Sequence, residues 1–480
     1  MAVDSLNPSQ RAAVEHDLGP MLVLAGAGSG KTRVVTTRIA RLLERGVSAK
    51  AILAMTFTNK AAGEMHERVR KLVGNKAAKD LTVSTFHRFG LGVLGQETRA
   101  LGLRGTKFAI FDQADAAGMV REILRGIQSG RSYDVGAILA RISAAKNEFV
   151  DPDKWEEAER AGRGDPYDEI SSLVYPRYLD ALRTQQAFDF DDLICEVVRL
   201  WRRRAEVLER WQQRYRYVIV DEYQDTNHAQ LELTRLLGSA HRNVCVVGDD
   251  DQSIYAWRGA DVRNILDFEE HFPGAKVVKL QENYRSAKAI LDVASVVLAK
   301  SGGKRHAKTI IATRPGGEKV QSVVCSDADV EASFVASEIQ RLLDEVGLRP
   351  KDIAVLYRSN QQSTEIESAL KERQIPFRLI GGTQFYERKE VKDLIAYLRL
   401  AFNPLDEMSL RRIVNYPARG IGDAAVAKLA AHATAHDLPL YTVVERCHAV
   451  VDLPPAALDG CRELVRLVQG TRARLDTNAA

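Results

Sequence analysis

The chain has few cysteines, and their spacing favours neither a disulfide framework nor a zinc site. The five residues are odd in number, scattered and free of any C-x-x-C pair, a usage typical of a reducing compartment. The first residues lack the basic and apolar segments of a secretory signal. No apolar run reaches the ~18 residues that a membrane span needs. We therefore expect a cytoplasmic protein with no membrane segment.

No excess of one charge sign is present either. With 68 basic and 64 acidic residues, the net charge is +4, which neither requires nor excludes nucleic acid, because binding depends on a local basic track. The composition, 45% apolar and 28% charged, is that of a globular protein. At 480 residues the chain is too long for one core and suggests roughly three domains.

Short apolar runs alternate with helical patterns up to residue 90 and return near residue 217. This order predicts an α/β fold with a parallel, doubly wound sheet. Acidic residues directly follow the two later runs, and the carboxyl ends of parallel strands are where such sheets bind ligands. The expected strands are 21–25, 52–57, 81–84, 217–220 and 244–247.

The rest of the chain divides into helical and mixed parts. Residues 90–200 are amphipathic and helical, with a polar loop near 151–168, which indicates a helical insertion. A second α/β region is expected to begin near Val277, and after about 377 the pattern is helical again. The strands expected in this second region are 277–280, 320–324 and 353–357.

A glycine-rich loop between the first strand and the first long helix predicts a triphosphate site. Glycines let backbone N–H groups approach phosphates, and the helix N-terminus adds its positive dipole end. Lys31 should reach the β- and γ-phosphates, and Thr32 should ligate Mg²⁺. A turn that binds nothing is the alternative, but strand, loop, Lys-Thr and helix together favour the nucleotide. The loop reads Ala25-Gly26-Ala27-Gly28-Ser29-Gly30-Lys31-Thr32, with Ala25 where a glycine is usual.

An acidic pair after the apolar run 217–220 supplies the second half of such a site. Asp221 would hold Mg²⁺, and Glu222 would act as general base toward the attacking water. Alone, an Asp-Glu pair of this kind usually marks only the end of a strand. Together with the glycine-rich loop it predicts nucleotide hydrolysis.

Several long motifs, in order along the chain, resemble the superfamily 1A DNA helicases of the Rep, PcrA and UvrD type. The resemblance runs from Leu6 to at least Gly422, and segment 84–91 looks most like Rep. It implies two tandem RecA-like P-loop motor domains with helical insertions. The motifs are Thr56–Ala62, Ser84–His87, Asp189–Asp192, Asp221–Thr226, Gly248–Ala260 and Glu282–Ser286.

The resemblance implies roles for residues around the nucleotide. Gln10 is similar to the residue that reads adenine, and an amide can both donate to and accept from the adenine edge. Arg33 and Tyr284 would pack around the base. Gln252 would sense the γ-phosphate, and Arg285 would be an arginine finger supplied by the second α/β region.

The resemblance also implies a single-stranded DNA track built from backbone contacts and base stacking. Tyr255 and Trp257 lie within six residues of Gln252, a short route for coupling hydrolysis to movement. For any one aromatic residue the alternative is core packing. For His87 the sequence favours neither of two roles, a buried histidine of the core or a contact to DNA. The residues expected to contact DNA are Phe57, Phe190, Tyr255, Trp257 and Arg258.

Three further segments carry weaker signals. Tyr357–Asn360 resembles a family motif near the DNA backbone. The basic cluster of Lys304, Arg305 and Lys308 is interpreted as a solvated loop in preference to a phosphate contact. The segment Arg419–Gly422 is either a hairpin that grips duplex phosphates or an ordinary turn.

The resemblance divides the chain into five segments. We expect 1–88 and 196–280 to form the first motor domain (1A), interrupted by the helical insertion 89–195 (1B). Segment 281–377 would be the first part of a second motor domain (2A), and 378–480 part of a helical accessory domain (2B). The family's later motifs, including a second arginine finger, are absent from 423–480. We therefore expect an incomplete second motor domain, in either a fragment or a natural short form.

These features predict an ATP- and Mg²⁺-dependent DNA helicase for repair or replication. It would move 3′ to 5′ on single-stranded DNA and act at junctions of single and double strands. The alternative is a shortened form that binds nucleotide and DNA without unwinding. A helicase–nuclease has no visible nuclease motif, and RNA is disfavoured by the resemblance. Protein partners, oligomeric state and pathway do not follow from the sequence.

Overall fold

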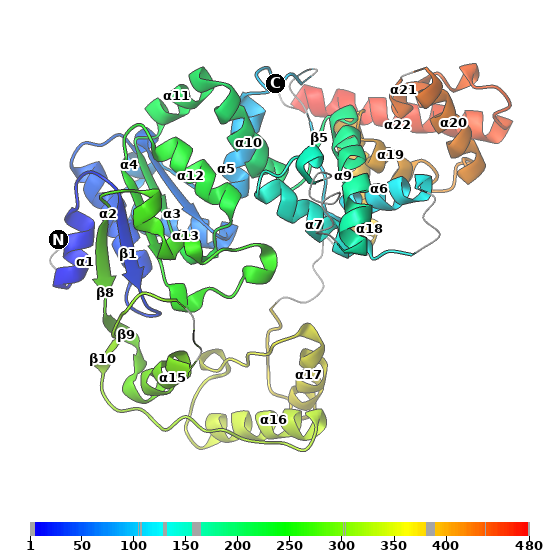
Figure 1. Cartoon of the computed structure of the whole chain (residues 1–480). Coiled ribbons are helices and arrows are strands. Elements are labelled where there is room, and N and C mark those ends of the chain that lie inside the picture. Colours follow the sequence, from blue (N-terminus) through cyan, green and yellow to red (C-terminus); the bar gives the residue numbers. More distant parts are fainter. Residues whose placement is uncertain are drawn as a thin grey trace.

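The computed structural model of the chain describes residues 5–478 except 104, 106–107, 128–131, 156–164, 301, 303, 381–388 and 437. A six-stranded, wholly parallel sheet organises the first half of the fold (Figure 1). The five strands predicted before residue 250 are all present, with ends shifted by one residue at most. In spatial order the strands are β3 (Thr82–Thr85), β2 (Ile52–Thr56), β6 (Tyr217–Val220), β7 (Val244–Gly248), β1 (Met21–Ala25) and β8 (Lys276–Leu280).

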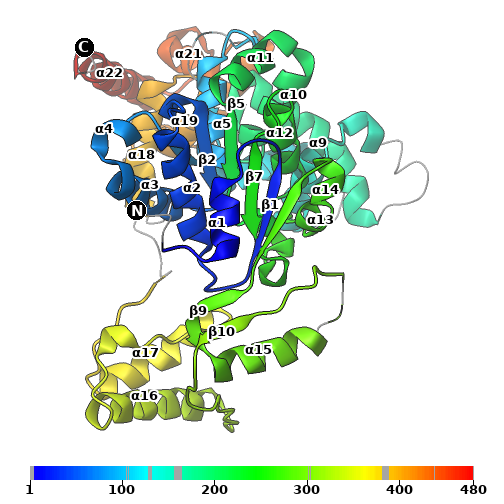
Figure 2. The same ribbon diagram turned by 90° about the vertical axis from the view of Figure 1, so that its left-hand side faces the viewer.

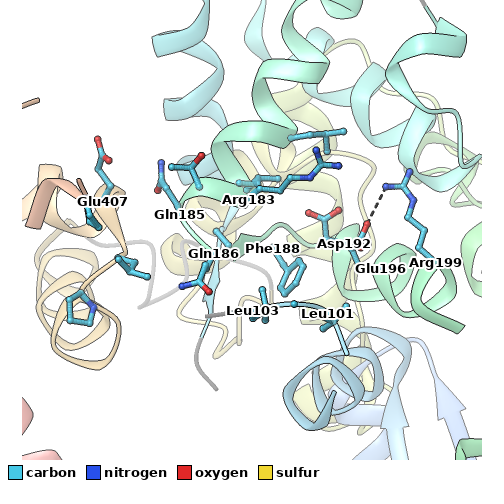
Figure 3. Close-up of a pocket in the computed structure, with 18 of the residues that line it drawn as sticks. Leu101, Leu103, Arg183, Gln185, Gln186, Phe188, Asp192, Glu196, Arg199 and Glu407 are labelled. Carbon is cyan, nitrogen blue, oxygen red and sulfur yellow. Dashed lines mark hydrogen bonds and ion pairs between the residues drawn. The ribbon is translucent and has the colours of Figure 1, made fainter. Parts of the chain in front are cut away.

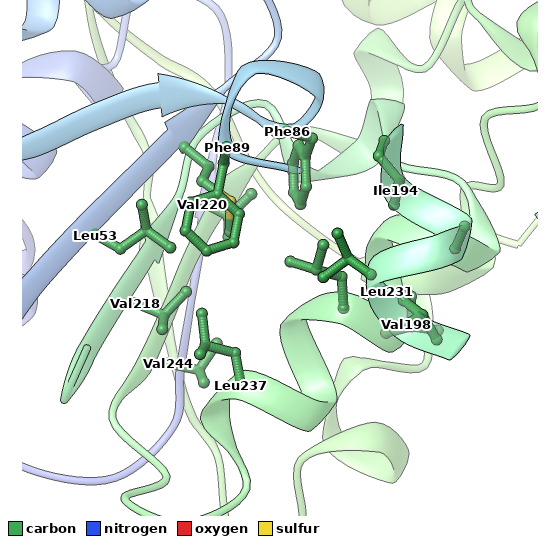
Figure 4. Packing of buried hydrophobic residues seen from close by; sticks show 14 of the residues in the cluster. Leu53, Phe86, Phe89, Ile194, Val198, Val218, Val220, Leu231, Leu237 and Val244 are labelled. Atoms are coloured by element: carbon green, nitrogen blue, oxygen red, sulfur yellow. The ribbon is translucent and has the colours of Figure 1, made fainter. Parts of the chain in front are cut away.

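Alternate side chains of these strands point into two different apolar cores, as the pleat of a β-strand requires. On β1, Leu22 and Leu24 enter the core beneath the helices that flank the insertion, whereas Met21 and Val23 enter the core beneath the first helices of the chain. The first of these cores is drawn in Figure 4, where Phe86 and Phe89 meet strand and helix residues. Both faces of the central strands are therefore buried, as the continuous apolar runs predicted.

Helices cover both faces of the sheet (Figure 2). Helices α1 to α3 belong to the core of Met21 and Val23, and α5, α10, α11 and α12 belong to the core of Leu22 and Leu24. Short helices α13 and α14 follow β7. The bounds are α1 (Pro8–Glu15), α2 (Lys31–Glu44), α3 (Asn59–Val73), α4 (Asn75–Ala78), α5 (Phe86–Gln96), α10 (Asp192–Arg203), α11 (Ala205–Arg214), α12 (His228–Gly238), α13 (Arg263–Leu266) and α14 (Phe268–His271).

The predicted helical insertion is present and has a core of its own. Helices α6, α7 and α9 pack together around Tyr175 and Tyr178, and a two-residue parallel pair, β4 with β5, closes the base. Part of the expected loop 151–168 lies outside the described residues. The bounds are β4 (Ala109–Ile110), α6 (Gln113–Gly126), α7 (Val135–Asn147), α9 (Pro166–Thr184) and β5 (Ala187–Phe188).

The predicted C-terminal helices form another separate core, and their first helix, α18, contacts the insertion (Figure 1). Arg399 of α18 pairs with Asp115 of α6 at 2.9 Å across this contact. No described helix is long and apolar enough to cross a membrane. The bounds are α18 (Lys389–Phe402), α19 (Glu407–Ile413), α20 (Asp423–Ala435), α21 (Leu440–Glu445) and α22 (Pro455–Asn478).

The region between β8 and α18 departs most from expectation. The strand pattern assigned 277–280 to the second α/β region, but β8 pairs with β1 along its full length and belongs to the first sheet, which agrees with the expected segment 196–280. The reason is that β8 lies alongside β1 and its side chains Val278 and Leu280 are buried in the core that β1 shares with the first helices. In the described part of this region, β9 (Glu282–Ala287) and β10 (Ile311–Arg314) are the strands present, and they form a two-stranded parallel sheet of their own.

The prediction of strands at 320–324 and 353–357 is wrong, since neither run forms a strand in the described part of the chain. Neither run has a strand beside it among the described residues, and a strand without a partner forms no ladder. The side chains of Val324 and Leu356 are each 94% exposed. Three helices accompany the two-stranded sheet: α15 (Lys288–Lys300), α16 (Ala328–Asp344) and α17 (Ser363–Glu372).

Candidate nucleotide and nucleic-acid site

The glycine-rich loop connects the buried end of β1 to the first residue of α2, as predicted. Gly28 and Gly30 both have positive φ, at 75° and 91°, a conformation that glycine adopts without steric cost. Ser29 is buried, and its hydroxyl donates to the carbonyl of Gly26 at 2.7 Å, closing the loop. Helix α2 begins at Lys31, so its free N–H groups point into the loop.

Strand β9, from the second α/β region, packs directly on this loop. A Cβ on Gly28 would lie 2.6 Å from the Cβ of Arg285 and 2.8 Å from the amide of Asn283. The Asn283 amide donates to the carbonyl of Ala27, and the backbone N–H of Tyr284 donates to the carbonyl of Gly28 at 3.0 Å. The structure therefore brings Arg285 and Tyr284 beside the loop, and their roles toward the nucleotide stay predictions. Asn283 was not singled out from the sequence, although it lies within a quoted motif.

The residues expected around adenine gather at the N-terminus of α1. Gln10 is buried, and its amide donates to the carbonyl of Ser29 at 3.0 Å. Asn7 caps α1 and donates to the hydroxyl of Tyr284 at 2.9 Å, while Arg33 donates to the carbonyl of Ser5 at 3.2 Å. Gln10 thus contacts the loop here, and its reading of adenine stays a prediction.

Lys31 and the acidic pair meet across a sequence separation of 191 residues. The ammonium of Lys31 forms an ion pair with Glu222 at 2.9 Å. Glu222 has φ 53°, a conformation that is uncommon for a residue with a side chain and that clusters at functional sites. Burial, and then the charge of Glu222, raise the pKa of Asp221 to about 6, against the opposing effect of Lys31.

A hydrogen-bonded network continues from Glu222 to the loop after β7. The buried amide of Gln224 donates to Glu222 at 3.0 Å, and its carbonyl oxygen accepts from the backbone N–H of Asp249 at 3.0 Å. The Asp249 carboxylate in turn accepts from the amide of Gln252 at 2.5 Å. Gln252 is therefore linked to Lys31 through three residues. Gln224 lies within the quoted motif 221–226 but was not singled out, because its contacts depend on two strand ends being adjacent.

Four of the five residues expected to contact DNA form one array. Phe57 stacks on Tyr255 with ring centroids 5.1 Å apart, and Trp257 lies 6.4 Å from Tyr255. The guanidinium of Arg258 lies 4.6 Å from the Trp257 ring. Trp257 is 69% exposed, which core packing would not allow. Phe190 lies elsewhere, against His87 at 5.7 Å, and is 55% exposed.

The lysines of the basic cluster at 304–308 have different surroundings in the structure. Lys308 is not on a solvated loop, since its ammonium lies among Asp249, Asp250 and Asp251, whereas Lys304 is exposed and pairs with Asp267. The interpretation of this cluster as a solvated loop is therefore wrong at Lys308, because the acidic loop after β7 lies against it.

The segment Arg419–Gly422 makes its contacts within the C-terminal helices. The backbone N–H groups of Arg419 and Ile421 both donate to the side chain of Asn415, and the Arg419 guanidinium donates to the carbonyl of Ile413. These two amides are thus engaged inside the turn, which favours the ordinary turn over a hairpin that grips phosphates. No contact tests the expectation for Tyr357–Asn360.

A cavity of about 800 Å³ lies where α9, β5 and α10 meet the C-terminal helices (Figure 3). Arg183, Gln185 and Phe188 line it, and Arg199 pairs there with Glu196 at 3.1 Å. It shares no residue with the glycine-rich loop or the acidic pair. We therefore assign the site from the geometry of those two elements.

Comparison with known proteins agrees with this geometry. The UvrD/REP helicase N-terminal domain matches residues 6–273, and the UvrD-like helicase C-terminal domain matches residues 278–446. The chain belongs to the UvrD/REP helicase family. Its tandem α/β arrangement is that of this family's two domains.

Individual relatives are named "ATP-dependent DNA helicase PcrA". The chain is 42% identical over 467 residues to that of Bacillus subtilis (strain 168), covering 96% of this chain and 62% of the relative. It is 40% identical over 470 residues to that of Staphylococcus aureus (strain Mu50), covering 97% and 63%. The chain thus spans about three fifths of the length of these UvrD/REP relatives. Both are PcrA proteins, so the expected particular likeness to Rep is not supported.

Proposed function

We propose that this chain is an ATP-hydrolysing motor of a DNA helicase. The observation that carries the proposal is the continuous network from Lys31 through Glu222, Gln224 and Asp249 to Gln252. That network ends three residues before Tyr255, the centre of the exposed aromatic array. A triphosphate site and a base-stacking surface therefore share one short loop. The name given to the PcrA relatives favours this over a module that only binds.

In the proposed reaction, Lys31 and Glu222 exchange partners. In the structure they neutralise one another at 2.9 Å. The γ-phosphate of ATP would compete for the Lys31 ammonium and so free the Glu222 carboxylate. The water oxygen then attacks the γ-phosphorus while Glu222 accepts a proton from that water. The bond between the γ-phosphorus and the ADP oxygen breaks, which releases ADP and phosphate. Arg285 and Gln252 would stabilise the transferring group.

The residue types of Thr32, at the start of α2, and Asp221, after β6, fit a Mg²⁺ ion. Thr32 and Asp221 offer a hydroxyl and a carboxylate, the hard oxygen donors that Mg²⁺ prefers. One Asp221 oxygen accepts from the backbone N–H of Glu222 at 3.0 Å, which leaves the other for a cation. Bound there, the ion would neutralise charge on the β- and γ-phosphates.

The substrate we propose is single-stranded DNA, including its junctions with duplex, in repair or replication. Phe57, Tyr255, Trp257 and Arg258 would stack on bases, and Phe190 would add a contact beside His87. Stacking tolerates any base, which suits a translocating motor. The 3′-to-5′ direction rests on the family resemblance.

The decisive experiment measures ATP hydrolysis by the 480-residue chain with and without single-stranded DNA. We expect DNA to stimulate the rate and Lys31→Ala to lower it by about 10²-fold or more, since a pre-organised contact to the transferring phosphate is lost. Lys50→Ala, at an exposed lysine that is 3.9 Å from Asp80, serves as the control and should leave the rate unchanged. Full activity in Lys31→Ala would refute the site.

A second measurement tests the DNA surface. Trp257→Ala should weaken binding of a fluorescent oligonucleotide by about tenfold, within the ~1–3 kcal/mol that one stacked base contributes. Nucleotide binding should remain. An unchanged affinity would exclude the aromatic array as the track, and strand displacement on a tailed duplex then reports whether this chain unwinds DNA.

A further inference from the structure

The segment that joins α15 to β10 lies against the nucleotide site of the first motor region. Lys279 of β8 donates to the carbonyl of Ala307 at 2.7 Å, which holds the segment at the edge of the first sheet. A Cβ built on Gly26 would lie 3.3 Å from Ile310 and 4.0 Å from the Asp249 carboxylate. Residues 307–310 therefore border both the glycine-rich loop and the acidic loop after β7.

Lys308 is the buried cation of this segment. Its side chain is 8% exposed, and its ammonium contacts Asp249, Asp250 at 2.6 Å and Asp251 at 2.9 Å. Lys304, four residues earlier, is 74% exposed and makes a single ion pair with Asp267 at 2.8 Å. The two lysines thus share a segment and a charge but differ in burial and in partners.

The three carboxylates need a cation in this place. Asp249 and Asp250 are almost fully buried, and a triphosphate bound beside them would add further negative charge. Burial alone would lower the pKa of Lys308, but hydrogen bonds to Asp249 and Asp250 outweigh it and the pKa is raised. Lys308 therefore carries its charge throughout the neutral range.

Asp249 is the shared partner of Lys308 and Gln252. It accepts from the Gln252 amide at 2.5 Å, while Lys308 contacts its other oxygen. If Lys308 left, the loop would hold three adjacent carboxylates with one compensating cation fewer. The orientation of Asp249, and with it that of Gln252, would then change.

We propose that Lys308 is a positioning residue for ATP hydrolysis, which acts by holding the Asp249–Asp251 loop so that Gln252 faces the γ-phosphate. Because Lys308 belongs to the segment between α15 and β10, it also makes the sensor depend on how the second region is placed. The proposal rests on the ATPase function proposed above and adds a residue outside the motifs that carried it.

The test compares Lys308→Met, which removes the charge at nearly constant length, with Lys304→Met as the matched control. Steady-state ATP hydrolysis is measured with saturating single-stranded DNA. We expect Lys308→Met to lower kcat about tenfold or more, because small misplacements of a catalytic group have large effects. KM for ATP and oligonucleotide affinity should change less than about twofold. Lys304→Met should match the unsubstituted chain, and Lys308→Arg should recover most of kcat.

A second variant guards against a general folding defect. Asp250→Asn combined with Lys308→Met removes one uncompensated carboxylate and should restore part of kcat, which a merely unfolded variant would not do. Equal kcat in Lys308→Met and Lys304→Met, in a chain that hydrolyses ATP, overturns this proposal alone. A chain without Lys31-dependent hydrolysis overturns the proposed function and this inference with it.

Discussion

Lys146 in α7 should be one of the residues on which the stability of the insertion most depends. Its side chain is fully buried, and its ammonium pairs with Asp189 at 2.6 Å and Asp192 at 2.9 Å. Tyr178 donates to Asp189 at 3.0 Å, so the network joins α7, α9 and the start of α10. Replacing Lys146 by Met keeps the apolar stem and removes the charge.

The two carboxylates respond differently to the single ammonium. Burial would raise the pKa of Asp189, but Lys146 outweighs it and the pKa is lowered. Burial, together with the charge of Asp189, raises the pKa of Asp192 to about 8. Asp189 is therefore the carboxylate whose negative charge depends most on Lys146, and it is the buried charge that loses its partner in Lys146→Met.

The expected loss is therefore that of one broken buried pair, about 3–5 kcal/mol in the free energy of unfolding. Urea unfolding followed by tryptophan fluorescence at pH 7.5 measures it. Lys50→Met, at an exposed pair, should cost about 0–1 kcal/mol. Lys146→Met with Asp189→Asn and Asp192→Asn should recover much of the loss, because both carboxylates that Lys146 contacts are then neutral.

The pH dependence of this loss gives a sharper test. Without Lys146, the folded-state pKa of Asp189 should rise above its unfolded value. A group with a raised folded pKa stabilises the fold at low pH, and that contribution is lost as pH rises. The deficit of Lys146→Met should therefore be smaller at pH 5.5 than at pH 7.5, by about 1.4 kcal/mol for each unit of pKa change within that window. A deficit below about 1 kcal/mol at pH 7.5, or one that grows on acidification, would refute the reasoning.

Two further predictions concern α5. A Cβ on Gly90 would lie 1.8 Å from the carbonyl oxygen of Leu193 in α10, whereas a Cβ on Gly92 meets nothing within 4 Å. Gly90→Ala should therefore lower the free energy of unfolding by about 1–3 kcal/mol. Gly92→Ala should raise it by up to about 1 kcal/mol, because alanine favours a helix more than glycine does. Urea unfolding checks both, and equal effects would contradict the helix contact. Burial lowers the pKa of His87 from its ordinary 6.5, so below that pH the unfolded chain binds the proton first and stability falls. His87→Gln should reduce the fall in unfolding free energy between pH 7.5 and 5.5, and an unaltered slope would show that His87 is not responsible.

The first sheet could be predicted from the sequence because its strands are short, apolar runs buried on both faces. Residues 217–220 and 244–247 stand out in this way, and both are strands. The same pattern misled at 320–324 and 353–357. Apolar composition reports a preference for burial, but a strand also needs a neighbour along its edge, and the sequence does not show which neighbour is present. Run 277–280 was correctly predicted as a strand; the strand pattern assigned it to the second region, whereas the expected segment 196–280 included it in the first, where it lies.

The site divides in a similar way. Lys31 and Glu222 could be selected because each lies in a motif whose residue types match phosphate chemistry, and the fold brings them into contact. The contacts of Gln224 and Lys308 could not be predicted from the sequence. The first links neighbouring strand ends, and the second reaches 59 residues back along the chain to Asp249. Contacts of this kind follow from strand order, which no local pattern contains.

The strand order also explains how the residues proposed to bind nucleotide and those proposed to bind DNA could respond to one another. Strand β7 lies between β6 and β1, so the loop after it lies beside both the acidic pair and the glycine-rich loop. That loop carries Gln252, which contacts Asp249, and then, within five residues, the exposed Trp257. A shift of Asp249, which is held by Gln224 on one side and Lys308 on the other, would move both. The second α/β region supplies Lys308 and Arg285 to this place, so in the proposed mechanism its position relative to the first sheet would set the geometry of hydrolysis and of the stacking surface together.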